Sequence, residues 1–566
     1  MCLSPGMEEG PLGGLARAGN EVDPIVLRGA KLVDGTGAQG RAADVVVRGA
    51  RVAAVQEPGT ADGEIVNLDG LVLAPGIVDC HTHYDAQILW DPDLTPSCWH
   101  GVTTVVMGNC GFSLAPTRQG DRETIARTLE NVEGMALEAL AAGIPWDFET
   151  FPEYLDAVEA LPPRLNVAAM IGHTPLRTWV LGADATEREA SDGEIAEMRG
   201  IVAEALDAGA VGFATSKQGA HVGAYGKPVP SRFASAEEIN SIAEALGDRG
   251  RGTVAVTRGE DFDLQELAAL SLRIGRPVTW TALPASPTAM ATLREGHELG
   301  GEVWPQIACR PVVMQLTLAD PGPLAKARAF TEVLALPRDR RAELFVDQGW
   351  RDRARRDVLS SWGDRYGRMF VSETDAHVAL RDGPSIAQIA AERGEDPFDT
   401  LCDLALADNL TTRFRVVLAN DDEESLTQLL MDDRTLVGLS DAGAHASQLC
   451  DAVFSTHLLQ HWVRETGVLS LEKAVWRVTG HPAQVYGLPG RGLVAPGAFA
   501  DLLAFDPDAI AVKPAERVWD FPAGADRLVA GAEGIEAVWV NGVRTRAAGA
   551  DLDGVRPGRL IRDGGR

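Results

Sequence analysis

Two histidines separated by one residue, His81 and His83, are the sharpest chemical feature of the sequence. They end a short apolar run, PGIVDC, that is typical of a buried β-strand. Side chains two apart on a strand point to the same face, so the two imidazoles would converge. Converging imidazole nitrogens suit a borderline divalent metal such as Zn²⁺. An HxH pair is common by chance, but its place at the end of a strand favours a metal site.

A carboxylate and a thiol are candidates to complete this site. Asp441 ends a later β-like run, LVGLSDAGAH, and could both bind a metal and accept a proton from metal-bound water. Cys110 follows the run VTTVVM and would be a strong ligand as a thiolate. A single cysteine is more often part of an inert core, so its residue type alone favours a structural role.

These residues must be positioned by a chain that alternates β-like runs with amphipathic helices. Two of the helical segments, which begin at Ser191 and Ser235, open on an N-cap residue and close on glycine. Eight runs alternating with helices predict an α/β fold, a (β/α)8 TIM-like barrel, with a doubly wound sheet as the alternative. The runs are 75–83, 102–111, 166–173, 210–216, 252–258, 277–283, 302–311 and 436–445.

The two ends of the chain differ from the middle. Residues 24–74 and 490–550 consist of short Val- and Ile-rich runs broken by glycine turns, and they predict one small β-sandwich built from both terminal segments. Between them we expect the catalytic barrel at 75–489, with a charged helical insertion at about 321–430 that either covers the site or stabilises the periphery. Residues 1–23 lack the pattern of a signal peptide and predict a disordered leader.

Composition narrows the class of partner. The 566 residues include 52 Lys and Arg against 81 Asp and Glu, and the net charge of −29 argues against nucleic acid and anionic membranes as partners. No run approaches the roughly 18 apolar residues of a membrane span. Seven cysteines without CxxC spacing favour a reducing, cytoplasmic compartment. We expect a small-molecule substrate, and the sequence leaves a homo-oligomer open.

Taken together, the motifs resemble the metal-dependent amidohydrolase superfamily and, more narrowly, its D-aminoacylase (N-acyl-D-amino-acid deacylase) branch. The resemblance spans about residues 25–545 and rests on APGIVDCHTHYDAQ, HGVTTVVMGNCGFSLAP, IPWDFETFPEYLDAV, AGAVGFATSKQGAHVGAYGKPVP, VWPQIACRP, GLSDAGAH and RGLVAPGAFADLLAFD. It implies a barrel with a two-ended β-sandwich and a hydrolase of amide bonds. It further implies that His81, His83 and Asp441 bind metal, that Asp441 is the general base, and that Cys110 is a bridging ligand rather than inert core.

The chain departs from the superfamily at the fifth and sixth strands, where histidines usually hold a second metal. The corresponding stretches, TVAVTRGED and VTWTALPAS, contain no histidine. We therefore expect one Zn²⁺ per chain, with another divalent metal as the alternative. His173 and His221, which follow the third and fourth runs, could serve as substitute ligands, bind the substrate, or be satisfied loop residues.

An arginine is expected to bind the carboxylate of an acylated amino acid, because guanidinium groups bind carboxylates in a bidentate manner. Arg310 is the first candidate, and Arg177 and Arg258 are weaker ones. The main hypothesis is a metal-dependent hydrolase of N-acyl amino acids, expected to be the D-isomers. The alternatives are a mononuclear enzyme that acts on a cyclic amide or ester or runs a non-hydrolytic step, and a catalytically lapsed barrel. The sequence does not define the acyl group or the amino acid.

Overall fold

A parallel β-sheet occupies the centre of the computed structural model of the protein, which describes residues 23–562 and 564. Its eight strands lie side by side in chain order, and each lies inside one of the eight predicted runs. The strands are β8 (Ile77–Asp79), β9 (Val102–Met107), β10 (Asn166–Gly172), β11 (Gly212–Ser216), β12 (Thr253–Thr257), β13 (Val278–Thr281), β14 (Val303–Ile307) and β18 (Leu436–Val437). The predicted leader lies outside the described residues, apart from Asp23.

The sheet curls until its first and last strands meet. Thr82 pairs with Ala442 in a parallel bridge just beyond the ends of β8 and β18. Next to it, the backbone N–H of His83 donates to the carbonyl oxygen of Ala442 at 2.7 Å. A parallel sheet that returns to its first strand fits a TIM-like barrel and not an open, doubly wound sheet. The α/β class is therefore confirmed, and the curled sheet fits the predicted TIM-like barrel.

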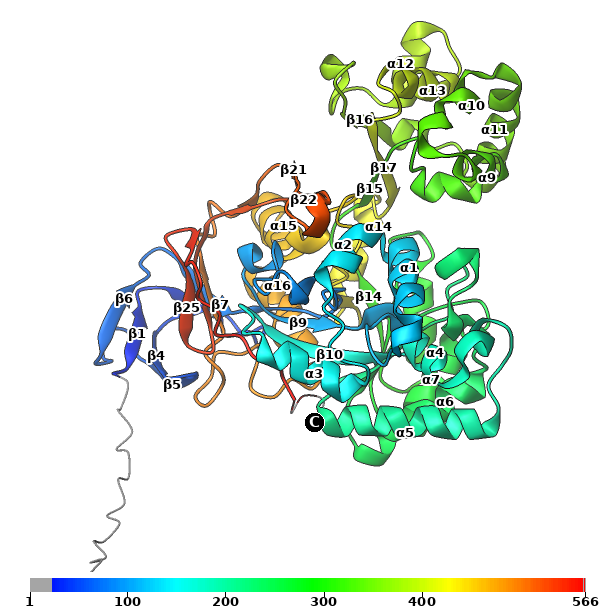
Figure 1. Cartoon of the computed structure of the whole chain (residues 1–566). Helices are drawn as coiled ribbons and strands as arrows, with labels where there is room; N and C mark the ends of the chain where they lie inside the picture. Colours follow the sequence, from blue (N-terminus) through cyan, green and yellow to red (C-terminus); the bar gives the residue numbers. More distant parts are fainter. Residues whose placement is uncertain (1–22, 563, 565–566) are drawn as a thin grey trace, which may run out of the picture.

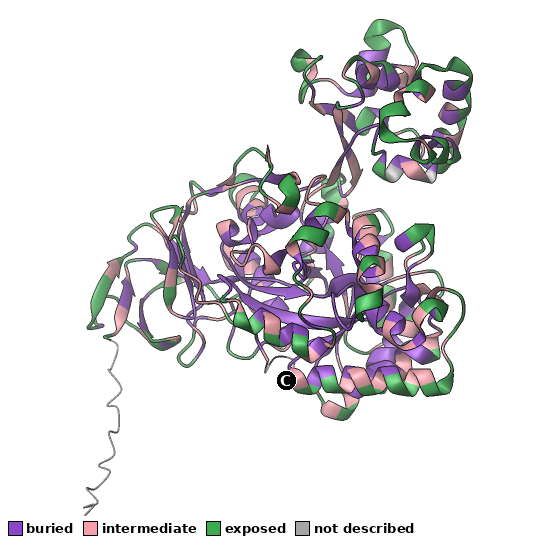
Figure 2. Cartoon of the chain, in the orientation of Figure 1, coloured by how far each residue is buried: buried purple, intermediate pink, exposed green. Residues whose placement is uncertain are grey.

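Helices cover the outside of the sheet, and the strands between them are buried (Figure 2). The two predicted helix starts are confirmed, because Ser191 caps α5 and Ser235 caps α6. Each of these helices ends at a glycine in the left-handed conformation. The helices around the barrel are α1 (Arg122–Glu133), α2 (Leu137–Gly143), α3 (Phe151–Ala160), α4 (His173–Leu181), α5 (Asp192–Ala208), α6 (Ala236–Arg249), α7 (Leu264–Ile274), α8 (Ala289–Glu298), α14 (Glu423–Met431), α15 (Phe454–His457), α16 (Leu471–Val478) and α17 (Gly480–Val485).

The N-terminal strands and the strands of residues 502–551 lie together beside the barrel (Figure 1). A four-stranded sheet, β5-β4-β1-β6, and a seven-stranded sheet, β26-β25-β24-β19-β7-β2-β3, contribute to one hydrophobic cluster that includes Val45, Leu73 and Trp539. In the larger sheet, β7 of the N-terminal segment pairs with β19 of the C-terminal segment. The strands are β1 (Ile25–Arg28), β2 (Lys31–Leu32), β3 (Arg41–Ala42), β4 (Asp44–Arg48), β5 (Arg51–Gln56), β6 (Glu64–Asn67), β7 (Val72–Pro75), β19 (Leu502–Phe505), β24 (Ile535–Val540), β25 (Val543–Ala547) and β26 (Ala550–Asp551).

A helical insertion follows the seventh barrel strand and stands away from the barrel (Figure 1). It is joined to the barrel through β15 and β17, which pair with each other, and it packs around its own core, where the buried Trp350 contacts Phe330, Phe345 and Phe398. Its elements are β15 (Val312–Leu316), α9 (Arg328–Ala335), α10 (Ala342–Val346), α11 (Gln348–Ser361), β16 (Met369–Glu373), α12 (Ile386–Arg393), α13 (Pro397–Ala407) and β17 (Arg413–Ala419). Across the described residues, no helix is both long enough and apolar enough to cross a membrane.

Candidate metal centre

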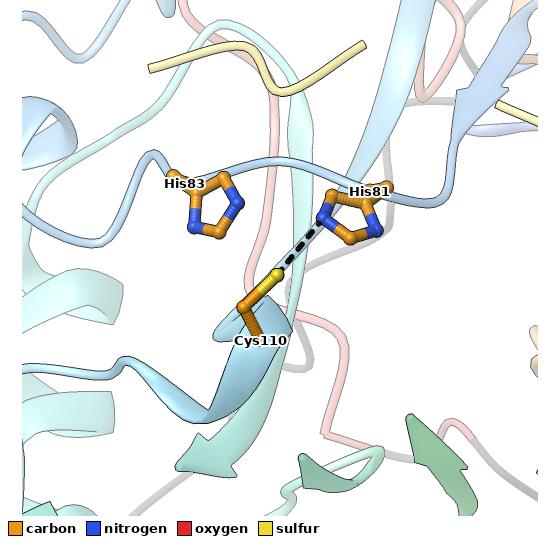
Figure 3. A group of neighbouring side chains, drawn as sticks. All are labelled: His81, His83 and Cys110. Carbon is orange, nitrogen blue, oxygen red and sulfur yellow. Dashed lines mark hydrogen bonds between the residues drawn. The ribbon is translucent and has the colours of Figure 1, made fainter. Parts of the chain in front are cut away.

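Three of the predicted ligands converge at the carboxyl ends of the first two barrel strands (Figure 3). One ligand atom from each of His81, His83 and Cys110 lies within 4.8 Å of the others, and all three side chains are buried. The Sγ of Cys110 lies 3.5 Å from Nε2 of His81. In the described part of the chain, no other group of three or more His, Cys, Asp or Glu residues has this spacing.

The histidine pair lies just past β8, which ends at Asp79. The bridge through Thr82 keeps this segment extended, so the alternation of side chains continues and the two rings stay on one side. Their centroids are 5.3 Å apart. The convergence that the spacing predicted is therefore present, although the histidines lie beyond the end of β8, in a segment whose backbone bonds to Val106 of β9 and to Ala442.

Asp441 approaches the cluster from the loop after β18. Its Oδ1 lies 3.2 Å from Nε2 of His81 and 3.7 Å from Nε2 of His83. Removal from water would raise the pKa of Asp441, but its contact with His83 and the charges of both histidines outweigh that effect and lower the pKa. Asp441 also has a left-handed backbone, with φ 47°. A strained carboxylate held in its ionised form beside two imidazoles suits both metal binding and proton transfer.

Cys110 is presented by a tight turn after β9. Gly108, with φ 87°, approaches the carbonyl oxygen of Met170 so closely that a Cβ would lie 2.2 Å from it. Burial opposes ionisation of the Cys110 thiol, yet the charge of His81 and contacts with His81 and His83 lower its pKa. The thiolate is the form that binds metal, so the environment favours the role as ligand over that of inert core.

Gln306 fixes the orientation of His81. Its side-chain NH₂ group donates to the hydroxyl oxygens of Thr279 and Tyr486, both at 3.2 Å. Its Oε1 must then accept from Nδ1 of His81, which lies 2.6 Å away. Protonation at Nδ1 leaves the lone pair on Nε2, the nitrogen that faces Cys110 and Asp441. Gln306 was not among the residues predicted from the sequence, where its only signal is that it is a polar residue inside the apolar run VWPQI.

His173 lies in a buried hydrogen-bonded group of its own. Its Nδ1 faces the hydroxyl of Thr215 at 2.8 Å, and its Nε2 faces Glu238 at 2.9 Å. The carboxylate of Glu238 also pairs with Arg177. Both ring nitrogens of His173 and the charge of Arg177 are thus used inside the fold, which favours the structural role that the sequence left open for this histidine.

His221 lies beside the cluster. Its Nδ1 is 2.8 Å from Oγ of Ser216, and its ring contacts Phe112 with centroids 5.4 Å apart. Burial, helped by the nearby charges of His83 and His445, lowers the pKa of His221 to about 3. The ring is therefore neutral at working pH and can hydrogen-bond a substrate carbonyl.

The candidate arginines differ in their surroundings. Arg310 pairs with Asp451, with Nη1 and Oδ1 at 2.9 Å, and its buried Nε has no hydrogen-bond partner in the described part of the chain. Arg258 stacks over Trp280 with its guanidinium 4.7 Å from the ring centroid.

At the end of the sixth strand, the hydroxyl of Thr281 lies 3.5 Å from Nδ1 of His81.

Two imidazoles, a thiol and a carboxylate at the strand ends of a barrel are typical of metal-dependent barrel hydrolases. The chain belongs to the amidohydrolase family, whose model matches residues 64–546. It is similar to D-aminoacylase from Alcaligenes xylosoxydans xylosoxydans, with 32% identity over 528 residues that cover 92% of this chain and 93% of the relative. The expected family resemblance is confirmed.

Two solved structures extend this similarity to the whole fold. One is a structure of D-aminoacylase with a TM-score of 0.65 and 29% identity, and the match covers 95% of this chain and 99% of that chain. That structure comes from work on the binuclear metal centre of D-aminoacylase, with one-metal activation and second-metal attenuation. N-acyl-D-glutamate deacylase from Bordetella bronchiseptica has a TM-score of 0.64 and 27% identity over the same shares of the two chains. The latter was solved with zinc and a phosphonate inhibitor that mimics the tetrahedral intermediate.

Proposed function

We propose that the protein is a zinc-dependent deacylase that hydrolyses the amide bond of N-acyl-D-amino acids. The observation that carries the proposal is the approach of Asp441 to His81 and His83 beside Cys110, with Nε2 of His81 directed into the group. The related D-aminoacylase and the zinc complex of the related D-glutamate deacylase support the substrate class and the metal.

The four candidate ligands suit zinc in chemical type. Imidazole nitrogens, a thiolate and a carboxylate are the ligands that Zn²⁺ binds in proteins, and His81, His83, Cys110 and Asp441 would hold the ion. Bound zinc lowers the pKa of a water to about 7 and polarises a carbonyl group. We infer one ion per chain, because the fifth and sixth strands end in threonines where the family usually has histidines.

The side chains transfer the proton, hydrogen-bond the carbonyl oxygen and bind the carboxylate of the substrate. Asp441, held ionised, accepts a proton from the attacking water at its carboxylate and returns it to the nitrogen of the leaving amine. Neutral His221 donates a hydrogen bond to the carbonyl oxygen as negative charge develops there. Arg310, a partly exposed guanidinium paired with Asp451, is the candidate to bind the carboxylate of the substrate, and Arg258 is the alternative for that role.

We also propose the division of the chain made from its sequence. The shared hydrophobic cluster of the two terminal sheets supports a β-sandwich from 24–74 and 490–550 beside a barrel at 75–489. The separate core around Trp350 supports a helical insertion at about 321–430.

The free state of the six described cysteines supports a cytoplasmic location. A homo-oligomer stays an open expectation.

The test is hydrolysis of a panel of N-acetyl-D-amino acids, their L-isomers and cyclic imides by the zinc-loaded full chain. We expect cleavage of the D-series, and we expect Asp441→Asn to lower kcat by about 100- to 10,000-fold with an unchanged melting temperature. Cleavage of cyclic imides without deacylation would replace the proposed function with the mononuclear cyclic-amide alternative. An Asp441→Asn variant with the wild-type rate would overturn the role of the general base.

A further inference from the structure

Glu133, the last residue of α1, carries a buried carboxylate outside the predicted ligand set. The residue is only 3% exposed. An ionised carboxylate is costly to bury unless it is paired. Among the ion pairs of the described residues, Glu133 pairs with no lysine or arginine, and its partners are His83 and His445. Its Oε1 lies 3.5 Å from Nδ1 of His83, and its Oε2 lies 3.9 Å from Nε2 of His445.

The carboxylate faces the side of His83 that points away from the metal cluster. Nε2 of His83 faces Asp441, whereas Nδ1 is buried and makes no hydrogen bond to any described residue, so Glu133 is its nearest acidic group. A carboxylate on this side favours the proton on Nδ1, which leaves the lone pair of Nε2 free for a metal. Glu133 therefore faces Nδ1 of His83 on the side where Gln306 faces Nδ1 of His81, but as an ion-pair contact at 3.5 Å and not as a hydrogen bond at 2.6 Å.

Glu133 also contacts the loop that carries Asp441. Its carbonyl oxygen accepts the backbone N–H of His445 at 2.5 Å. Two glycines permit this close approach: a Cβ on Gly134 would lie 3.0 Å from Nδ1 of His445, and a Cβ on Gly443 would lie 2.6 Å from the carbonyl oxygen of His83. The end of α1, the segment after β8 and the loop after β18 therefore meet at one point, where Glu133 contacts the other two elements.

We propose that Glu133 is a positioning residue of the metal centre. Its carboxylate orients His83 through Nδ1, and its backbone carbonyl holds the loop from which Asp441 reaches the cluster. The charge distinguishes it from the neutral amide of Gln306, because a carboxylate partner raises the basicity of the ligating imidazole. The inference rests on the proposed function, since it takes His83 as a ligand.

The test compares Glu133→Gln, which removes the charge and keeps the size, with Glu130→Gln on the same helix. Full chains are stripped of metal, zinc affinity is measured by competition with a chromophoric chelator, and the metal-free proteins are melted. We expect Glu133→Gln to weaken zinc binding by about 10- to 100-fold with little change in the metal-free melting temperature. At saturating zinc, kcat falls and KM stays unchanged. Glu130→Gln matches the wild type in every measurement.

The outcomes separate this inference from the proposed function. A wild-type chain that binds no zinc overturns the proposed function. A wild-type chain that binds zinc tightly, with Glu133→Gln within twofold of it, overturns only the positioning role. If Glu133→Gln does not fold, Glu133→Asp is measured instead. This variant keeps the negative charge but moves the carboxylate away from His83 by the length of one methylene group. Zinc affinity should again fall, and an unchanged affinity in that variant overturns the inference.

Discussion

Replacing Gln306 with leucine removes the hydrogen bond that orients His81 and leaves the side-chain volume nearly unchanged. The lost contact is the 2.6 Å hydrogen bond between Oε1 of Gln306 and Nδ1 of His81, both buried. Either the Nδ1 proton stays buried without an acceptor, or it moves to Nε2 and blocks the nitrogen that faces Cys110. An unsatisfied buried polar group costs about 1–3 kcal/mol, so zinc affinity should fall by about 5- to 150-fold.

Gln306→Glu provides the matched contrast. One carboxylate oxygen can still accept from Nδ1 of His81, and the other can accept from the hydroxyls of Thr279 and Tyr486, which lie 3.2 Å from the present amide nitrogen. A carboxylate is the stronger acceptor, so this variant should bind zinc at least as tightly as the wild type. Zinc affinity is therefore expected to fall in Gln306→Leu and to stay equal or rise in Gln306→Glu.

The assay is chelator competition for zinc on the three purified full-length chains, with thermal melting of the metal-free proteins as the control for folding. A leucine variant within twofold of the wild type in zinc affinity would refute the reasoning that Gln306 sets the tautomer of His81. Equal losses in both variants would refute it as well, because they would show a packing effect and not a hydrogen-bond effect.

Three further predictions concern stability and the parts that surround the site. Gly443→Ala places a Cβ 2.6 Å from the carbonyl oxygen of His83 at a φ of 94°, so we expect a loss of about 1–3 kcal/mol in the free energy of unfolding, and an unchanged denaturation midpoint would contradict this. Burial lowers the pKa of His100 to about 4 in the folded chain. In the unfolded chain this imidazole binds a proton near pH 6.5, whereas in the folded chain it does so only near pH 4. The free energy of unfolding should therefore be highest above pH 6.5 and fall by up to about 3 kcal/mol as the pH falls towards 4. Denaturation at pH 7 and pH 4.5 should show a smaller difference for His100→Gln than for the exposed control His297→Gln, and equal differences would contradict it. Trp350→Ala should destabilise the insertion core by about 3–5 kcal/mol, seen as faster hydrogen exchange in the insertion alone, whereas uniform acceleration across the barrel would contradict a separate core.

Much of the barrel and part of the candidate site could be predicted from the sequence, because both depend on local patterns. Each barrel strand is a short apolar run between helical segments, and the HxH spacing follows directly from the alternation of side chains in an extended segment. The approach of Asp441 to His81 could be inferred because a barrel of parallel strands in chain order closes by bringing its first and last strands together.

The residues that orient the ligands could not be predicted, because they reach the site through packing across the fold. Gln306 is 225 residues from His81 in sequence, and Glu133 ends a helix with no motif that marks it. His173 shows the converse case, since its place after the third strand suggested chemistry, whereas Glu238 from α6 occupies it inside the fold. Sequence spacing indicates which residues share a strand end and does not indicate which partners a helix brings to them.

We propose that one zinc ion, held by His81, His83, Cys110 and Asp441, is sufficient for hydrolysis of N-acyl-D-amino acids. The most direct measurement is titration of the metal-free full chain with zinc, with bound metal counted by elemental analysis and deacylation of an N-acyl-D-amino acid followed at each addition. We expect activity to rise to a maximum at one equivalent of zinc per chain. Full activity in the metal-free chain, or a requirement for a second equivalent, would contradict it.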